Sequence, residues 1–308
     1  MTTSTCAPKD AESNPSAGLK VIQRREFVDK YMLPRDAAEK ERLTFQHYLL
    51  SSMFQHYLYR HEFHGNFSSP IEDALEGGIN VIDVSCGVGI WTIEMAQDFP
   101  NSTFVGTDLV DMFPKHEIPE NCSFVQANTL ERLPFPDDTF DFTFQRLVQM
   151  AYSPADWATV IAELVRVTKP GGWIELFESD SLMHRPPKSY LKYQKAWLAS
   201  THSRGIDINI ALNLGHLLEE ALIDVKADYI SFPVGWNGRA GELMGHNLEL
   251  CRLALSPIIA PFMEMTTEDY EQWAMQISKE LRMHRSYING YYAYGRKPVK
   301  HGEAEVAN

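Results

Sequence analysis

The chain has 308 residues, of which 44% are hydrophobic and 22% are charged. This length supports one large or two smaller globular domains with an ample core. The formal net charge of −13 argues against nucleic acid or an anionic membrane as a partner, because phosphates attract clustered Lys and Arg. No apolar run approaches the roughly 20 residues of a membrane span, and no signal-peptide pattern opens the chain.

The four cysteines are scattered and form no C-x-x-C pair: Cys6, Cys86, Cys122 and Cys251. Neither a disulfide framework nor a zinc site is therefore expected. A reducing, intracellular compartment fits this cysteine usage best.

Two N-terminal segments precede the first strand pattern. Residues 1–18 contain almost no large apolar side chain, which predicts a disordered tail. Residues 19–70 are interpreted as a helical lid, with a helix that begins at Asp36 after Pro34. This segment is rich in histidine, but no acid stands at metal-ligand spacing on the helix, so no metal site is predicted.

Short apolar strands and helices alternate between residues 79 and 178, which predicts a parallel sheet covered by helices on both faces. The expected strands are 79–84, 103–107, 123–126, 140–144 and 173–177, and the expected helices are 90–98 and 155–168. Ligands of such sheets bind at the carboxyl ends of the strands.

The C-terminal third predicts a hairpin whose two strands are separated by a helical insertion. A helix is expected at 211–222, a strand at 225–234, a helical cap at about 236–285 and a closing strand at 286–295. These elements complete a main domain at 71–297, followed by a loose tail at 298–308.

A strand, a small-residue turn and a helix follow one another at residues 79–96. Asp83 ends the strand, and Gly87 and Gly89 lie in the turn, where glycine allows a ligand to approach the backbone closely. Asp108 ends the next strand, a position that typically binds ribose hydroxyls. A dinucleotide site needs a third glycine, but Thr92 stands there. The pattern therefore favours a nucleoside without phosphates.

Three motifs resemble those of class I S-adenosylmethionine-dependent methyltransferases, in the order and spacing of that family. They are Asp83–Gly89, Leu133–Asp141 and Lys169–Trp173. Residues 31–36, 41–47, 145–147 and 157–167 resemble, more narrowly, the fungal LaeA-like and UMTA-type methyltransferases. The resemblance implies an α/β, Rossmann-like, seven-stranded and mostly parallel sheet.

The resemblance also implies S-adenosyl-L-methionine as the cofactor and assigns roles to residues by matching positions. Asp83 and the turn from Gly87 to Gly89 would hold the methionine end. Asp108 would bind the ribose hydroxyls, and Leu109 would lie against the adenine. Ser85 would belong to the same turn, although the family usually has glycine there.

Further positions would complete the cofactor and acceptor sites. Asn128 and Thr129 would read the adenine edge, and Tyr31 would lie near the cofactor. Gln145 and Arg146, placed just past the fourth strand, would face the methyl group and the substrate.

Four of these assignments have alternatives. Arg146 could instead pair with an acid such as Glu178, and His47 could be a catalytic base or a hydrogen-bonded lid residue. Asp83 could cap the turn, and Asp108 could be a solvated loop acid. Cys86 is expected to pack rather than to react, because neighbouring acids oppose a thiolate.

Two functional hypotheses from different classes remain. The first is a methyltransferase (EC 2.1.1) of fungal secondary metabolism that acts on a small-molecule acceptor by in-line displacement. The second is a LaeA-like regulator that acts through protein partners. An aminopropyltransferase is a weaker third reading. The expected location is cytoplasmic under the first hypothesis and nuclear under the second.

Overall fold

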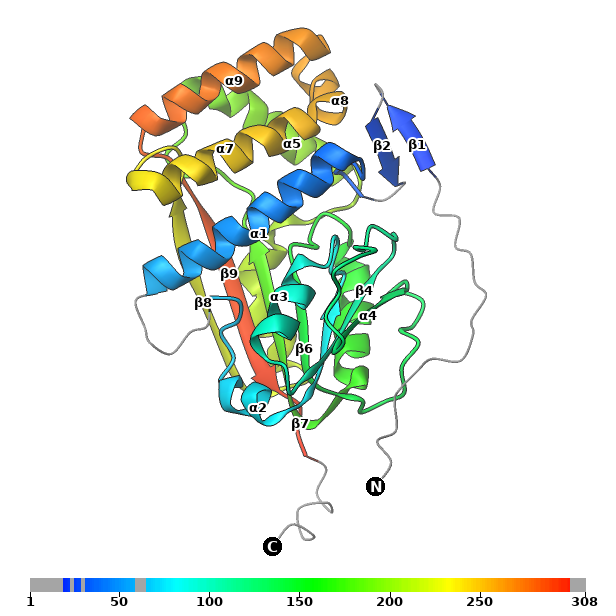
Figure 1. Cartoon of the computed structure of the whole chain (residues 1–308). Coiled ribbons are helices and arrows are strands. Elements are labelled where there is room, and N and C mark those ends of the chain that lie inside the picture. The colour runs from blue at the N-terminus through cyan, green and yellow to red at the C-terminus, as the bar shows by residue number, and fades with distance from the viewer. Residues whose placement is uncertain (1–18, 23–24, 29–30, 59–64, 300–308) are drawn as a thin grey trace, which may run out of the picture.

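The computed structural model describes residues 19–22, 25–28, 31–58 and 65–299. Residues 1–18 and 300–308, which belong to the predicted tails, lie outside the described residues. A seven-stranded sheet forms the centre of the molecule, in the order β5-β4-β3-β6-β7-β9-β8 (Figure 1). The predicted α/β, Rossmann-like fold with a seven-stranded sheet is therefore confirmed.

The sheet is parallel except at β9. Its strands are β3 (Asn80–Val84), β4 (Thr103–Asp108), β5 (Cys122–Gln126), β6 (Phe140–Arg146), β7 (Thr168–Ser179), β8 (Ile223–Pro233) and β9 (Tyr287–Arg296). Strands β5, β4, β3, β6 and β7 pair in parallel, whereas β9 pairs antiparallel with both β7 and β8. The predicted hairpin split by a helical cap is present, because the cap helices connect β8 to β9.

Helices cover both faces of the sheet because its central strands are apolar on both sides. In β3, Val81, Ile82 and Val84 are fully buried, Val81 in one core and Ile82 and Val84 in the other. One face carries α2 (Glu72–Gly77) and α3 (Ile90–Asp98), and the other carries α4 (Pro154–Val167) and α6 (Leu214–Glu219). Helix α6 is shorter than predicted, since residues 208–213 form a 3₁₀ turn.

The lid and the cap share a third core with the end of the sheet. Helix α1 (Ala37–Leu58) packs along α7 (Gly238–Ala254), as Figure 1 shows. Helices α5 (Leu191–Ser203), α8 (Ser256–Ile259) and α9 (Thr267–Met283) complete this layer. The segment predicted as a helical lid is helical in α1 but not throughout, because β1 (Leu19–Ile22) and β2 (Arg25–Val28) form an antiparallel hairpin before it.

The carboxyl ends of β3, β4, β6 and β7 meet at one edge of the sheet, because parallel strands share a direction. Gln145 and Arg146 are the last two residues of β6 rather than residues beyond it. Their side chains therefore point to opposite sides of the sheet, since successive side chains in a strand alternate.

Gly89 is required by packing against a neighbouring strand. It has a φ of 74°, and a Cβ at this position would lie 2.4 Å from Cε1 of Phe124. We expect Gly89→Ala to lower the free energy of unfolding by about 2–4 kcal/mol, from left-handed strain and overpacking together. Urea denaturation measures this.

Gly205→Ala is the matched control, because Gly205 has a φ of 69° but a Cβ at its position would meet no described atom within 4 Å. Gly205→Ala should lower the free energy of unfolding only by the left-handed strain, about 1–2 kcal/mol. Equal losses in the two variants would show that Phe124 does not impose the glycine.

Candidate functional site

A cavity of about 430 Å³ opens at the carboxyl ends of β3, β4 and β6, beneath α1. It is of the size that small-molecule ligands use. Ten of the residues proposed from the sequence line it: Tyr31, His47, Asp83, Ser85, Gly87, Asp108, Leu109, Asn128, Thr129 and Arg146. Gly89 and Gln145 lie outside this lining.

The turn after β3 holds three alternate residues in the left-handed region. Ser85, Gly87 and Gly89 have φ values of 62°, 60° and 74°. No described atom lies within 4 Å of a Cβ built on Gly87, so this glycine faces open space of the cavity. The two glycines therefore serve different purposes: Gly87 leaves room for a ligand, and Gly89 leaves room for Phe124.

Asp108 closes the turn from the neighbouring strand. Its Oδ2 accepts the backbone N–H of Gly87 at 2.9 Å, and its Oδ1 accepts that of Val110 at 2.9 Å. Each oxygen keeps a lone pair for a further donor. Burial raises the pKa of Asp108 above its ordinary value, while the backbone N–H groups oppose that rise.

Asp83 is more deeply buried, with only 2% of its surface exposed. Burial raises its pKa to about 6, and the hydroxyl of Thr92, which donates to Oδ2 at 2.7 Å, acts in the opposite direction. Arg146 also favours the charged form. A cationic ligand at this position would therefore meet a carboxylate with little competing solvation.

Ser85 is anchored across the cavity by Tyr152, which follows β6. The Ser85 and Tyr152 hydroxyls lie 3.1 Å apart. This contact joins the loops after β3 and β6. Strain at the positive φ of Ser85 is thus offset by a hydrogen bond that glycine could not make.

Asn128 uses its amide within its own loop. Its Oδ1 accepts the backbone N–H of Leu130 at 3.1 Å, and its Nδ2 donates to Glu131 at 3.1 Å. Leu109 presents its side chain to the cavity, while its carbonyl accepts Nε2 of Gln126 at 2.9 Å.

A chain of buried hydrogen bonds ties α1 to the sheet. Nη2 of Arg146 lies 2.8 Å from Nδ1 of His47, and Nε2 of His47 lies 2.7 Å from Oε2 of Glu94. The Glu94 oxygen also accepts Nδ2 of Asn66 at 2.7 Å. A guanidinium only donates, so Nδ1 must accept and Nε2 must carry the proton.

The geometry separates the alternatives for His47 and for Arg146. Both ring nitrogens of His47 are engaged and burial lowers its pKa, which favours a neutral lid residue over a catalytic base. The pairing of Arg146 with Glu178 is wrong, because Glu178 instead accepts the backbone N–H groups of Val148 and Gln149.

The sequence predicted that Gln145 faces the cavity, and this prediction is wrong. It is 1% exposed in β6, and neither of its amide atoms has a hydrogen-bond partner among the described residues. The alternation of a β-strand explains the error, because Arg146 points to the cavity and its neighbour cannot.

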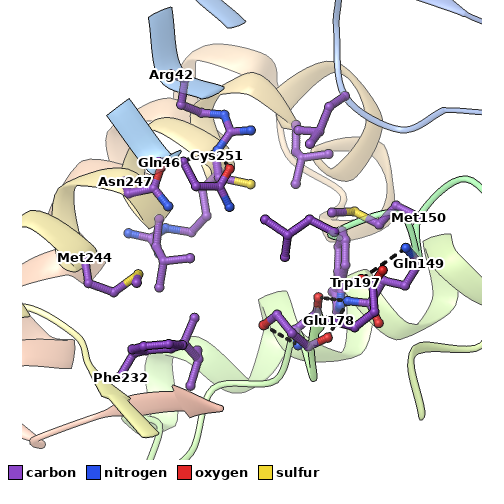
Figure 2. A pocket seen from close by; sticks show the side chains of 18 of the residues that line it. Arg42, Gln46, Gln149, Met150, Glu178, Trp197, Phe232, Met244, Asn247 and Cys251 are labelled. Atoms are coloured by element: carbon purple, nitrogen blue, oxygen red, sulfur yellow. Dashed lines mark hydrogen bonds between the residues drawn. The ribbon is translucent and has the colours of Figure 1, made fainter. Parts of the chain in front are cut away.

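A second cavity of about 140 Å³ lies between α1, α5 and α7, and Figure 2 shows the side chains around it. Its lining is mostly apolar. Residues common to both cavities are Tyr31, Leu33, Leu43, Gln46, Leu50 and Leu147. The smaller cavity, called the inner cavity below, therefore adjoins the larger one.

Within the described ranges, no group of three or more His, Cys, Asp or Glu side chains could hold a metal ion. None of the helices in these ranges has the length and apolar character of a membrane span.

Comparison with known proteins supports a methyl-transfer site. A family model described as a methyltransferase domain matches residues 81–172. Methyltransferase str3 of Strobilurus tenacellus is 27% identical over 210 residues, which cover 66% of this chain and 70% of that protein. N-methyltransferase sirN of Leptosphaeria maculans is 26% identical over 285 residues, which cover 87% and 95% of the two chains.

A regulator is also similar to this chain. Secondary metabolism regulator LAE1 of Cochliobolus heterostrophus is 29% identical over 212 residues, which cover 66% of each chain and so just under two thirds of the regulator. The sheet topology, the cavity at the strand ends and the matching domain together define a class I methyltransferase. Within that class, the chain is similar to fungal methyltransferases and to LaeA-like regulators.

Sequence reasoning missed the places that three residues of this region occupy. Tyr152 and Glu94 act through Ser85 and His47, and Glu178 lines the inner cavity. Only Glu178 had a usable signal, since it stands near the end of a predicted strand. The partners of Tyr152 and Glu94 are distant in the sequence and could not be paired without the fold.

Ser85 and Tyr152 can be tested by a double-mutant cycle. We expect Ser85→Ala to lower the free energy of unfolding by about 1 kcal/mol, because it loses the hydroxyl and keeps the positive φ. Ser85→Gly should be closer to wild type, because it also loses the strain. Tyr152→Phe should cost less in the Ser85→Ala background than alone. Strict additivity in chemical denaturation would exclude the bond.

His47 should make the stability depend on pH. Its folded-state pKa is lowered, so its contribution is complete above the unfolded value of about 6.5 and is lost as pH falls through that region. The free-energy difference between wild type and His47→Gln should therefore shrink from pH 7.5 to pH 5. Glu94, whose pKa is lowered by His47, stays charged in this window.

His116→Gln is the control, because His116 is exposed in a loop. Its difference from wild type should stay constant over the same pH range. If the free-energy difference between wild type and His47→Gln were equally constant, this would contradict the assignment of His47 as a neutral residue that bonds Arg146 and Glu94.

Proposed function

We propose that this protein transfers the methyl group of S-adenosyl-L-methionine to a small-molecule acceptor in secondary metabolism. The observation that carries the proposal is the pair of adjoining cavities. The larger cavity presents Asp83, Asp108 and the open face of Gly87, and the inner cavity is lined mostly by apolar side chains. The relatives str3 and sirN, both named as methyltransferases, support it.

The residues of the larger cavity fit this cofactor chemically. Asp83 and Asp108 would oppose a phosphate but suit an amino group and ribose hydroxyls. Tyr31 offers an aromatic ring, which attracts a sulfonium. Gly87 leaves room beside the backbone, and Leu109 offers an apolar surface to the adenine.

When bound, the cofactor supplies a methyl group that is already activated for displacement. The protein's task is then to position the acceptor and to keep water away from it. Helix α1 performs part of this task, because His47 bonds it to Arg146 and Glu94 above the strand ends. Arg146 holds a fixed positive charge in the wall, and its hydrogen bond to Nδ1 occupies the lone pair with which His47 could take a proton.

A second candidate function rests on the similarity to the regulator LAE1. Under this alternative, the same fold would act in the nucleus through protein partners, with weak or protein-directed transfer. The mostly apolar lining of the inner cavity favours a small apolar molecule as the acceptor.

Asp108 should be needed for cofactor binding. We expect Asp108→Ala to weaken the binding of S-adenosylhomocysteine at least tenfold, because a charge-assisted hydrogen bond contributes about 1.5–3 kcal/mol. Isothermal titration calorimetry measures this. Asp141→Ala is the control, because Asp141 pairs with Lys169 near the amino end of β6, away from the cavity.

Unchanged affinity in Asp108→Ala would contradict the assignment of the cofactor site. Release of S-adenosylhomocysteine on addition of fungal metabolite extracts would support a small-molecule acceptor. Release only with added nuclear proteins would support the regulator instead.

A further inference from the structure

The inner cavity is the size of a single aromatic ring. Its volume is about 140 Å³, and an engineered apolar cavity of about 150 Å³ binds benzene. Most of its wall consists of aliphatic and aromatic side chains: Leu33, Leu50, Met150, Phe177, Met183, Tyr193, Phe232, Met244 and Leu255. A ring-sized apolar group would therefore fill it.

The wall also contains polar atoms that have no partner. Oε1 of Gln149 and Nε1 of Trp197 are buried and make no hydrogen bond to any described residue. Both side chains line the cavity and are 2% and 4% exposed. A buried polar atom without a partner costs about 1–3 kcal/mol, so these atoms indicate a ligand that carries its own polar group.

Glu178 lies in the same wall. Its two oxygens accept the backbone N–H groups of Val148 at 2.8 Å and Gln149 at 3.2 Å, and each retains a lone pair. It is 1% exposed, and burial raises its pKa to about 8. In Figure 2, Glu178, Gln149 and Trp197 lie on the same side of the cavity, away from Arg42.

The other ionisable groups of this cavity are either paired or held neutral. Arg42 donates to both carboxylate oxygens of Glu39. Nη2 of Arg252 donates to the hydroxyl of Ser278, whereas its Nε has no partner among the described residues. Burial raises the pKa values of the remaining ones, Tyr31, Tyr190, Tyr193 and Cys251. Of the described groups that line it, Glu178 is thus the one that can exchange a proton near neutral pH.

We propose that the inner cavity takes a neutral, ring-sized acceptor with one protic group, of the phenol type, and that Glu178 receives the proton of that group. The proposal rests on the function proposed above. Gln149 and Trp197 are positioning residues that orient the acceptor's polar edge.

The transfer then balances in one step. The acceptor oxygen forms a bond to the methyl carbon, and the bond between that carbon and the donor sulfur breaks with its electron pair left on sulfur. The O–H proton passes to a Glu178 oxygen and is later released to water. The products are a methyl ether, a neutral thioether and a protonated carboxyl group.

Two probes of equal ring size distinguish binding that depends on the protic group from binding that depends only on the apolar ring. They are p-cresol, which has an O–H, and 4-methylanisole, its methyl ether, which has none. Each is titrated by ligand-observed NMR into full-length protein saturated with S-adenosylhomocysteine. The variants are Glu178→Gln and, as a matched control, Glu175→Gln. Glu175 is also buried on β7 and bonded to backbone N–H groups, but it does not line the inner cavity.

Wild type should bind p-cresol about tenfold or more tightly than 4-methylanisole, because only p-cresol can donate a hydrogen bond to the Glu178 carboxylate. Glu178→Gln should remove most of this preference, and Glu175→Gln should retain it. The affinity of wild type for p-cresol should also rise from pH 7 to pH 9, as Glu178 ionises, and should stay flat in Glu178→Gln.

Equal binding of the two probes, no binding of p-cresol, or an equal loss in Glu175→Gln would each overturn the proposal. If Glu178→Gln does not fold, a flat pH profile in wild type overturns it. Calorimetry with S-adenosylhomocysteine alone keeps the two claims apart. If S-adenosylhomocysteine binds but the protein does not discriminate between the two probes, only the acceptor assignment is rejected. If S-adenosylhomocysteine does not bind, the proposed function itself is rejected.

Discussion

The hydrogen bonds from Arg146 through His47 to Glu94 hold helix α1 over the site. They connect the end of β6, helix α1 and helix α3. His47 is buried, so breaking either of its bonds would leave a buried ring nitrogen without a partner. This constraint keeps α1 above the strand ends, where its residues line both cavities.

Two cavities with different chemistry result from this arrangement. The larger one lies over the strand ends and carries carboxylates, as suits a cationic nucleoside. The inner one is bounded by α1, α5 and α7 and is mostly apolar, with Glu178 in its wall. Their shared lining residues show that the two cavities adjoin. Burial in the inner cavity also explains why the pKa of Glu178 rises.

Local patterns predicted most of the fold. The apolar runs around Val81 and Phe142 identified the parallel strands, and Ser153 with Pro154 marks the start of α4 through a capping box. The β1–β2 hairpin was missed because its strands have only four residues each. Of the candidate site, Gln145 was misplaced because two adjacent residues at a strand end were treated alike, although a strand sends them to opposite sides.

The sequence by itself determined the class of protein, since Asp83, the glycine turn and Asp108 follow one another within 26 residues and act locally. Only the tertiary structure decided which side chains meet. Tyr152 reaches Ser85 across 67 positions, and Arg146 reaches His47 across 99. Such contacts depend on strand order and helix packing, which bring distant segments together. The inner cavity likewise exists only where the lid and the cap pack against the same sheet edge.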